Sequence, residues 1–347
     1  MLGDGGGIVA VDIGSTSVKL VEVRGSPEAP ELVRAGMAAL PEGALQNNTI
    51  ADVVAVAEVS RSLIADLGVT ARRAVTAVPG PSVIIKKASV HLKPDEDLET
   101  LLMVEAQNFV PENLENLSLD YHVLRHEAED VEVLIVAVRR DILSGFMGAL
   151  SDAGLDPVIV DVDYFALENM FEFNYECGPD DVVALIDIGA RFSSINVLRG
   201  GFSTATGDVQ AGGGEIVDAL TSSLGVSTDE AERLIGGGAA DPELRERADT
   251  VIARGVAELA DAIDQSLRFL WRTASDEPLQ LVYITGGAAR IRGLREALAS
   301  RLGVSVESVN PFARMHFGSE IDPAAIEEMA PMLGVAVGLA TRRPEDA

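Results

Sequence analysis

An aspartate, a turn of small residues and a lysine stand together near the start of the chain. Backbone N–H groups and hydroxyls in such a turn point toward one spot and bind phosphate oxygens. The aspartate repels bare phosphate, but it can orient the waters of a magnesium ion that bridges phosphates. The candidate ligands are Asp12, Gly14, Ser15, Thr16, Ser17 and Lys19. This stretch predicts a binding site for a magnesium nucleotide, although a hairpin turn also uses glycine for backbone reasons alone.

A second copy of the motif lies in the other half of the chain. The stretch 183–201 aligns without gaps to the first copy, so that Asp187 matches Asp12 and Gly189 matches Gly14. The candidate ligands of the second copy are Asp187, Gly189, Ala190 and Ser193. Two matching turns from different halves can face each other and hold a triphosphate between them. Asp12 and Asp187 would then flank the metal ion.

Two glycine clusters follow in the second half. Glycine lacks a side chain, so these clusters allow an adenosine to lie close to the backbone. The candidates are Gly212, Gly213, Gly214 and Glu215 in the first cluster, and Gly286, Gly287 and Ala288 in the second. A glycine pair also serves as an ordinary turn between a strand and a helix.

The elements that must position these residues alternate between strands and helices. Each motif copy is predicted to be a β-hairpin, because alternating apolar runs flank the turn. Helices are predicted over 52–67, 95–109, 140–154 and 251–274, and strands over 74–80 and 157–163. The cluster Pro79-Gly80-Pro81 marks a boundary. We therefore expect an α/β fold of two duplicated βαβ-type domains around a nucleotide cleft, with an inserted subdomain.

Composition excludes several classes of partner. The 347 residues carry a net charge of −28, which repels nucleic acid and anionic lipid. Cys177 is the single cysteine, so no internal disulfide forms. The N-terminal residues lack the pattern of a signal peptide, and no apolar run reaches the length of a membrane span. These features predict a cytoplasmic, soluble protein without direct membrane insertion.

The order of the motifs resembles the actin-like ATPase fold, which actin, hexokinase and FtsA share. Within that fold the chain resembles the PilM family of type IV pilus assembly proteins. The resemblance rests on VDIGSTSVKLVEV, AVPGPSVIIKK, VEAQNFVPENLENLSLDYHVL, ALIDIGARFSSINVL, VYITGGAARIRGL and APMLGVAVGLA, which run in order over nearly the whole length. It implies that residues 1–81, 157–180 and 331–347 form the first actin-like domain, 82–156 the inserted subdomain, and 181–330 the second domain.

The resemblance also implies cofactors and partners. Members of the family bind ATP with Mg²⁺ between the two domains. They hold the N-terminal tail of the membrane protein PilN in a groove beside the inserted subdomain, which links them to the inner-membrane pilus platform and its motor. The chain is thus expected at the inner membrane through a partner, with a homo-oligomer possible. Ile85, Phe109 and Val110 are the candidate residues of the partner groove, although Phe109 and Val110 could instead pack the subdomain itself.

The chain departs from the family pattern at several positions. Val217 and Ile235 stand where members commonly carry a threonine and a lysine, and Arg191 and Phe192 follow the second turn where small hydroxyl residues are usual. No residue visibly positions a water for hydrolysis, so the catalytic residues stay unknown and the chain is at most a weak ATPase. A pseudo-ATPase adaptor without nucleotide is therefore the main alternative.

Two further alternatives are weaker. A small-molecule kinase of the hexokinase type would use Asp161 or Asp163 as its base, but no clustered substrate pocket is evident. A filament protein like FtsA would carry a C-terminal amphipathic membrane helix, whereas this sequence ends in RRPEDA. The sequence thus favours a nucleotide-binding scaffold.

Overall fold

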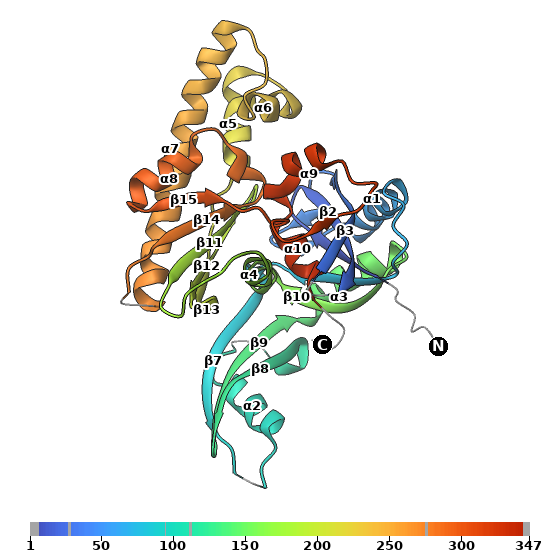
Figure 1. Cartoon of the computed structure of the whole chain (residues 1–347), viewed down its shortest axis with the longest axis vertical. Coiled ribbons are helices and arrows are strands. Elements are labelled where there is room, and N and C mark those ends of the chain that lie inside the picture. The colour runs from blue at the N-terminus through green and yellow to red at the C-terminus, as the bar shows by residue number, and fades with distance from the viewer. Residues whose placement is uncertain (1–6, 27–28, 94, 111–112, 275–276, 343–347) are drawn as a thin grey trace.

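The computed structural model describes residues 7–26, 29–93, 95–110, 113–274 and 277–342. Within them, two large mixed sheets form the centres of two lobes, and a three-stranded sheet projects from them (Figure 1). Strands and helices alternate along the chain. The predicted α/β class is confirmed.

The first large sheet contains the first motif copy at its centre. Its strand order is β10-β6-β1-β2-β3-β16. The strands are β1 Ile8–Ile13, β2 Ser17–Ser26, β3 Ala29–Ala39, β6 Arg73–Val78, β10 Asp156–Val162 and β16 His316–Phe317. β1 pairs antiparallel with β2 and parallel with β6, and β6 pairs parallel with β10. The predicted hairpin is therefore β1–β2, and its turn lies at one end of the central strands.

The second large sheet repeats this arrangement. Its order is β13-β12-β11-β14-β15, formed by β11 Val182–Ile188, β12 Ser193–Arg199, β13 Phe202–Val209, β14 Leu281–Thr285 and β15 Ser305–Ser308. β11 pairs antiparallel with β12 and parallel with β14, as β1 does with β2 and β6. Five strands of each sheet thus share order and direction, so the duplication extends from the motif to the whole sheet.

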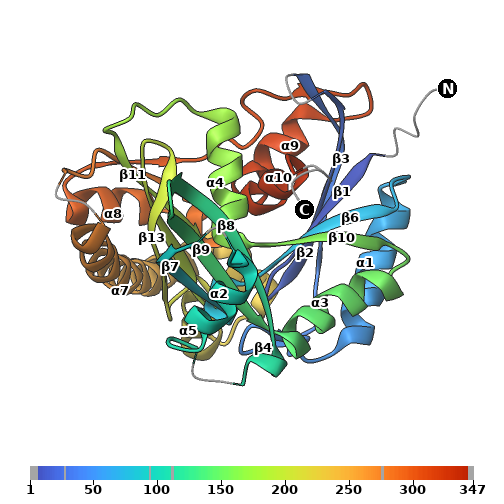
Figure 2. The ribbon, with the colours of Figure 1, turned by 90° about the horizontal axis from the view of Figure 1, so that it is seen from below.

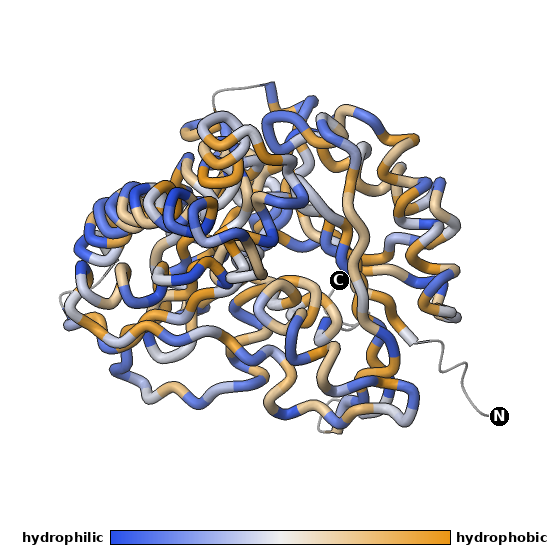
Figure 3. The backbone as a smooth tube through the Cα atoms, turned by 90° about the horizontal axis from the view of Figure 1, so that it is seen from above, coloured by the Kyte–Doolittle hydropathy of each residue, from blue (hydrophilic) through white to orange (hydrophobic). Residues whose placement is uncertain are grey.

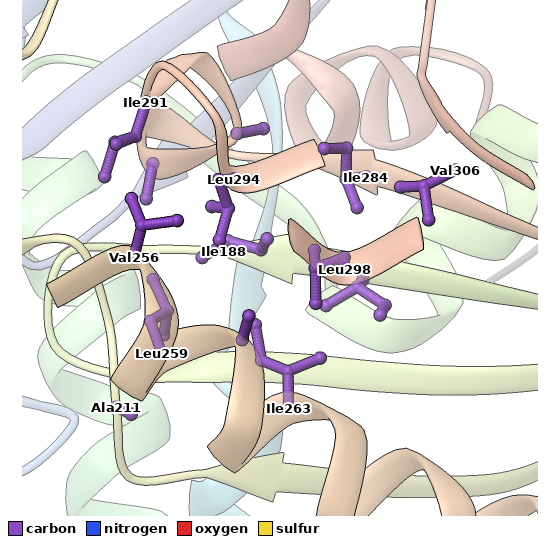
Figure 4. Packing of buried hydrophobic residues seen from close by; sticks show 14 of the residues in the cluster. Ile188, Ala211, Val256, Leu259, Ile263, Ile284, Ile291, Leu294, Leu298 and Val306 are labelled. Carbon is purple, nitrogen blue, oxygen red and sulfur yellow. The ribbon is translucent and has the colours of Figure 1, made fainter. Parts of the chain in front are cut away.

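Amphipathic helices cover the outer faces of both sheets. α1 Val53–Asp66 and α3 Arg140–Asp152 pack on the first sheet, and α5 Gly214–Leu224, α6 Thr228–Ile235, α7 Pro242–Ala274 and α8 Leu294–Leu302 on the second. In the second lobe Val256, Leu259 and Ile263 from α7 meet Leu294 and Leu298 from α8 over the sheet (Figure 4). Hydrophobic and hydrophilic residues alternate along the outer helices in Figure 3, as expected where one helix face is buried.

Two helices cross between the lobes. α4 Asp163–Asn174 follows β10, and α10 Gly334–Ala340 follows a 3₁₀ turn. α4 lies between the second sheet and α10 (Figure 2). At the crossing the Cα of Gly338 approaches the Ala166 carbonyl so closely that an added Cβ would lie 1.6 Å from that oxygen. On its other side α4 meets the second sheet through apolar contacts, such as Phe171 edge-on to Tyr283 with 5.3 Å between ring centroids, and through a polar contact in which the amide of Asn196 donates to the Tyr164 carbonyl, 3.1 Å away. α4 is therefore the main connection between the lobes.

The projecting sheet has the order β7-β9-β8 and one covered face. It is built from β7 Val83–His91, β8 Leu117–Glu127 and β9 Asp130–Arg139, with α2 Leu98–Ala106 packed on it. Val131, Val133 and Ile135 of β9 point to the side of α2 and pack with Leu102. The intervening residues of β9 point to the opposite face, toward the first lobe.

The packing moves two of the expected domain boundaries. Phe146 and Leu150 of α3 share a hydrophobic cluster with Val9 and Val56 of the first lobe, whereas no residue of α3 enters the clusters under α2. Residues 309–330 pack in the cluster shared by the lobes, and β16 extends the first sheet. We therefore propose that the inserted subdomain comprises residues 83–139 and that residues 309–330 belong with the first lobe. The expected ends of the first domain, 1–6 and 343–347, lie outside the described residues.

Three elements differ from the sequence-based expectation. α7 begins at Pro242 instead of residue 251, because Asp241 caps it by accepting from the Glu243 amide, 3.0 Å away. α2 is shorter than predicted, and β13 was not predicted as a strand. Among the described residues no single helix is long and apolar enough to cross a membrane; the pair Pro323–Met332 and Gly334–Ala340 meets that criterion only jointly and is bent by 100°.

Candidate nucleotide site

The two predicted turns have the same backbone arrangement. Gly14 donates its N–H to the Ser17 carbonyl at 2.9 Å, and Gly189 donates to the Phe192 carbonyl at 3.1 Å. The N–H groups of the intervening residues find no hydrogen-bond acceptor in the described part of the protein: these are Ser15, Thr16, Ala190 and Arg191. Each turn therefore offers two free donors, as expected for an anion-binding turn.

Lys19 connects the two turns electrostatically. Lys19 lies directly across the β1–β2 ladder from Asp12, and its Nζ is 2.8 Å from the Asp12 Oδ2. Burial alone would lower the pKa of Lys19, but the carboxylates of Asp12 and Asp187 outweigh this effect and raise it. Lys19 thus pairs with Asp12 of its own lobe, and the charge of Asp187 of the other lobe acts on it from farther away, so the two motif copies lie near each other.

Asp187, the aspartate of the second turn, is half-buried, as is Asp12. Burial raises its pKa to about 6, with Lys19 opposing the rise and Asp12 adding to it. Gly286 lies against this carboxylate: it has φ +92°, and a Cβ there would lie 2.3 Å from Asp187 Oδ1. Gly286 therefore leaves room for the Asp187 carboxylate. The residues of the second glycine cluster that could still contact a nucleotide are its neighbours Gly287 and Ala288. Of these, Gly287 is exposed and Ala288 is buried.

The first glycine cluster packs on the second turn. Gly213 and Gly214 donate their N–H groups to the carbonyls of Gly189 and Ala190, at 2.9 and 2.8 Å. A Cβ on Gly212 would lie 2.5 Å from the Ala190 oxygen. These glycines allow three backbone segments to converge, but the amides of Gly213 and Gly214 are already used.

A small cavity opens beside this cluster. It has a volume of about 30 Å³, room for about one water molecule, and lies between α5 and α7. Its walls include Gly212, Glu215, Arg254, Gly255 and Glu258. Glu215, a predicted ligand, is therefore placed at the cavity, whereas the α7 residues were not identified from the sequence. A nucleoside would enter this space only if α5 and α7 separated.

The serine and threonine candidates divide into two groups. In the first turn Thr16 is exposed, Ser15 is half-buried and Ser17 is buried. In the second, Ser193 is fully buried and its hydroxyl donates to the Ala211 carbonyl at 2.8 Å, so Ser193 supports the turn from inside. We correct its assignment from nucleotide ligand to support.

Sequence analysis missed a group of polar residues behind the turns. Tyr164 donates its hydroxyl to Asp208, and the Asp163 Oδ1 accepts from the Gly80 and Tyr164 amides at 2.9 and 2.7 Å. Burial raises the pKa of Asp163 well above its usual range, and the charges of Asp187 and Asp208 add to this. The Asp163 carboxyl therefore lies at the junction of the lobes, although the sequence indicated it only as an alternative kinase base.

Asp161, the other alternative base, is fixed by an ion pair. Its Oδ2 lies 2.8 Å from Nε of Arg342, at the end of α10, and its Oδ1 accepts from the Val162 amide. The side chain is buried. These contacts give Asp161 a structural role and remove one of the two residues on which the kinase alternative depended.

The two positions that depart from the family pattern lie in the core. Ile235 is buried in the cluster of the second lobe, and Val217 packs against the same cluster. Neither residue lines the cavity between α5 and α7.

The three residues of the predicted partner groove lie on opposite faces of the inserted sheet. Ile85 packs toward the first lobe, together with Val136 and Val138. Phe109 and Val110 pack under α2 on the other face, and Val110 is buried there. Because one groove cannot include both faces, we propose that Phe109, which is half-buried, and Val110 stabilise the subdomain and that Ile85 belongs to the groove.

The described residues of the two turns can bind phosphate oxygens and can contribute one or two carboxylates to a magnesium ion. Free backbone donors on two turns suit phosphate oxygens, and magnesium needs only one or two carboxylates besides water, which Asp12 and Asp187 provide. In the described residues no group of three or more His, Cys, Asp and Glu side chains is placed to hold a metal ion by itself. The metal would therefore arrive with the phosphates.

Comparison with known proteins decides the family. The model of the family described as type IV pilus assembly protein PilM matches residues 10–344. The chain belongs to the PilM family. A solved structure of the PilM-PilN type IV pilus biogenesis complex is 29% identical, with a TM-score of 0.84 over 96% of this chain and 97% of that one. Both motif copies, the glycine clusters and the inserted sheet lie inside the matched range.

More distant structures share the fold. An activator of the 2-hydroxyisocaproyl-CoA dehydratase from Clostridium difficile, solved with bound ADPNP, is 13% identical, with a TM-score of 0.50 over 98% and 95% of the two chains. A Bacteroides thetaiotaomicron protein described as having an actin-like ATPase fold is 8% identical, with a TM-score of 0.50 over 98% and 97%. The predicted actin-like ATPase fold is confirmed.

Proposed function

We propose that this protein is a cytoplasmic, ATP-binding scaffold of the type IV pilus inner-membrane platform. The observation that carries the nucleotide part is the pairing of two anion-binding turns, one from each lobe, around Lys19. In this arrangement Asp12 and Asp187 hold the waters of the Mg²⁺ ion, and the turn amides hold phosphate oxygens. The dehydratase activator with bound ADPNP shows that the fold accommodates such a nucleotide in that protein.

The same arrangement explains how nucleotide would alter the molecule. Because each lobe contributes one turn, a bound triphosphate holds the lobes together, and α4 and α10 lie between them. The inserted subdomain is attached to the first lobe beside α4. Nucleotide and partner would then change each other's affinity by the same factor.

The partner we propose is the N-terminal tail of a PilN-type membrane protein. The related solved complex contains PilM with PilN. In this chain the half-buried residues Val83, Ile85, Val136 and Val138 form the face of the inserted sheet that points toward the first lobe. These residues pack against the first-lobe core yet stay half-buried, so an extended apolar peptide can add to this face, on the side opposite α2. The protein would thus reach the inner membrane and the motor through its partner.

Nucleotide binding is tested by calorimetric titration of the full chain with Mg-ATP, with and without a synthetic PilN-type tail. We expect Asp12→Ala to lower ATP affinity at least about tenfold, since it removes a metal contact and leaves Lys19 without its closest partner. In the wild type, ATP should change the affinity for the tail. Tail binding without any ATP binding would instead support the alternative, a pseudo-ATPase adaptor.

Partner binding is tested by two substitutions on opposite faces of the inserted sheet. We expect Ile85→Asp to lower tail affinity at least about tenfold in a folded protein, because it places a charge on the apolar face. Phe109→Asp should instead lower the melting temperature, because Phe109 packs under α2. Unchanged tail binding by folded Ile85→Asp would contradict the assignment of this face.

A further inference from the structure

Arg191 occupies the tip of the second phosphate turn. It lies between Ala190 and Phe192, and the equivalent residue of the first turn is Thr16. The side chain is exposed, and it forms no ion pair with any residue that the structure describes. Other exposed arginines, such as Arg73 and Arg247, also form no ion pair with the described residues, but Arg191 stands in a candidate phosphate turn.

The charges at the junction of the lobes lack a second cation. Four carboxyl groups influence one another there: those of Asp12, Asp163, Asp187 and Asp208. Lys19 is the cation that acts on this group in the described structure, and it is bound to Asp12. A triphosphate adds further negative charge, part of which Mg²⁺ balances. A guanidinium at the second turn would balance part of the negative charge that Lys19 and Mg²⁺ leave.

The position of Arg191 indicates which phosphate it would meet. Gly212 and Gly214 pack on the backbone of Ala190, on the side of the turn that leads to the cavity between α5 and α7. Arg191 follows Ala190 on the exposed side of the turn. If the nucleoside enters at the cavity, the phosphate chain runs past Ala190, and its terminal phosphate comes nearest to Arg191.

We propose that Arg191 binds the terminal phosphate of the nucleotide and makes this site discriminate triphosphate from diphosphate. The inference rests on the proposed nucleotide binding. Guanidinium groups bind phosphate through two parallel N–H···O bonds, which a hydroxyl at this position does not provide. Arg191 thus provides the tip of this turn with a charged group specific for the terminal phosphate.

The test is calorimetry of the full chain with Mg-ATP and with Mg-ADP. Hydrogen bonds to charged groups contribute about 1.5–3 kcal/mol, so Arg191→Ala should lower ATP affinity about tenfold or more and ADP affinity less than about threefold. Arg191→Lys should keep part of the preference, because it retains the charge and loses the two-pronged geometry. Arg73→Ala, which removes an exposed arginine from the end of the central strands away from the turns, should leave the ratio of ATP to ADP affinity unchanged.

The outcomes separate this inference from the proposed function. Wild-type protein that binds neither nucleotide would overturn both. Wild-type protein that binds ATP, with an Arg191→Ala variant that loses ATP and ADP affinity equally or loses neither, would overturn the role of Arg191 alone. Because Arg191 is exposed, the melting temperatures of its variants should equal that of the wild type, which checks that the protein remains folded.

Discussion

Gly338→Ala should lower the free energy of unfolding by more than about 3 kcal/mol, the largest effect that we expect of any single methyl group in this protein. The new Cβ would lie 1.6 Å from the Ala166 carbonyl oxygen and 2.5 Å from its carbon. Both atoms belong to the backbone, so no side-chain rotation relieves the clash. α10 and α4 would have to separate, and they lie between the lobes (Figure 2).

This effect is measured by urea denaturation, with Gly148→Ala as the matched control. Gly148 lies in the interior of α3, and nothing lies within 4 Å of an added Cβ. The control should therefore gain up to about 1 kcal/mol from helix propensity. A Gly338→Ala variant as stable as the wild type would show that the two helices do not cross at this distance.

Lys19→Met should destabilise the protein by about 2 kcal/mol at pH 8 and by less at pH 5. The substitution keeps a long apolar chain but removes the ammonium that pairs with Asp12 and whose charge acts on Asp187. Lys19 opposes the rise in the Asp187 pKa, so without it this pKa lies even further above the ordinary carboxyl value. A buried carboxylate then remains without a counter-charge.

The direction of the pH dependence follows from the pKa of Asp187. A carboxyl whose pKa is raised on folding lowers the stability of the folded state progressively as the pH rises from the ordinary carboxyl pKa to the raised pKa; the cost is complete above the raised pKa and vanishes below the ordinary one. The cost in Lys19→Met should therefore shrink between pH 8 and pH 5. Denaturation in the presence of EDTA measures it, and Lys19→Met combined with Asp187→Asn should recover stability at pH 8. A deficit independent of pH would contradict this explanation.

The elements that the sequence predicted well are those set by local patterns. Both hairpins and α1 formed as expected, because alternating apolar residues and a capping residue such as Asp52 act over a few positions. The start of α7 was missed because the region 242–250 lacks a clear apolar stripe, although Asp241 and Pro242 are the usual signal of a helix start. The boundary that we propose for the inserted subdomain differs from the expected one because periodicity does not tell which sheet a helix such as α3 packs on.

The sequence by itself determined the duplicated turns, the glycine clusters and the family, since residue type and spacing carry that information. The tertiary structure decided how these parts meet. It placed Lys19 near aspartates of both lobes, buried Ser193 behind the turn, and fixed Asp161 through Arg342. It also placed Phe109 on the face of the inserted sheet opposite Ile85. These outcomes depend on contacts between residues far apart in the chain, and the pattern of residues within a short stretch of sequence does not specify such contacts.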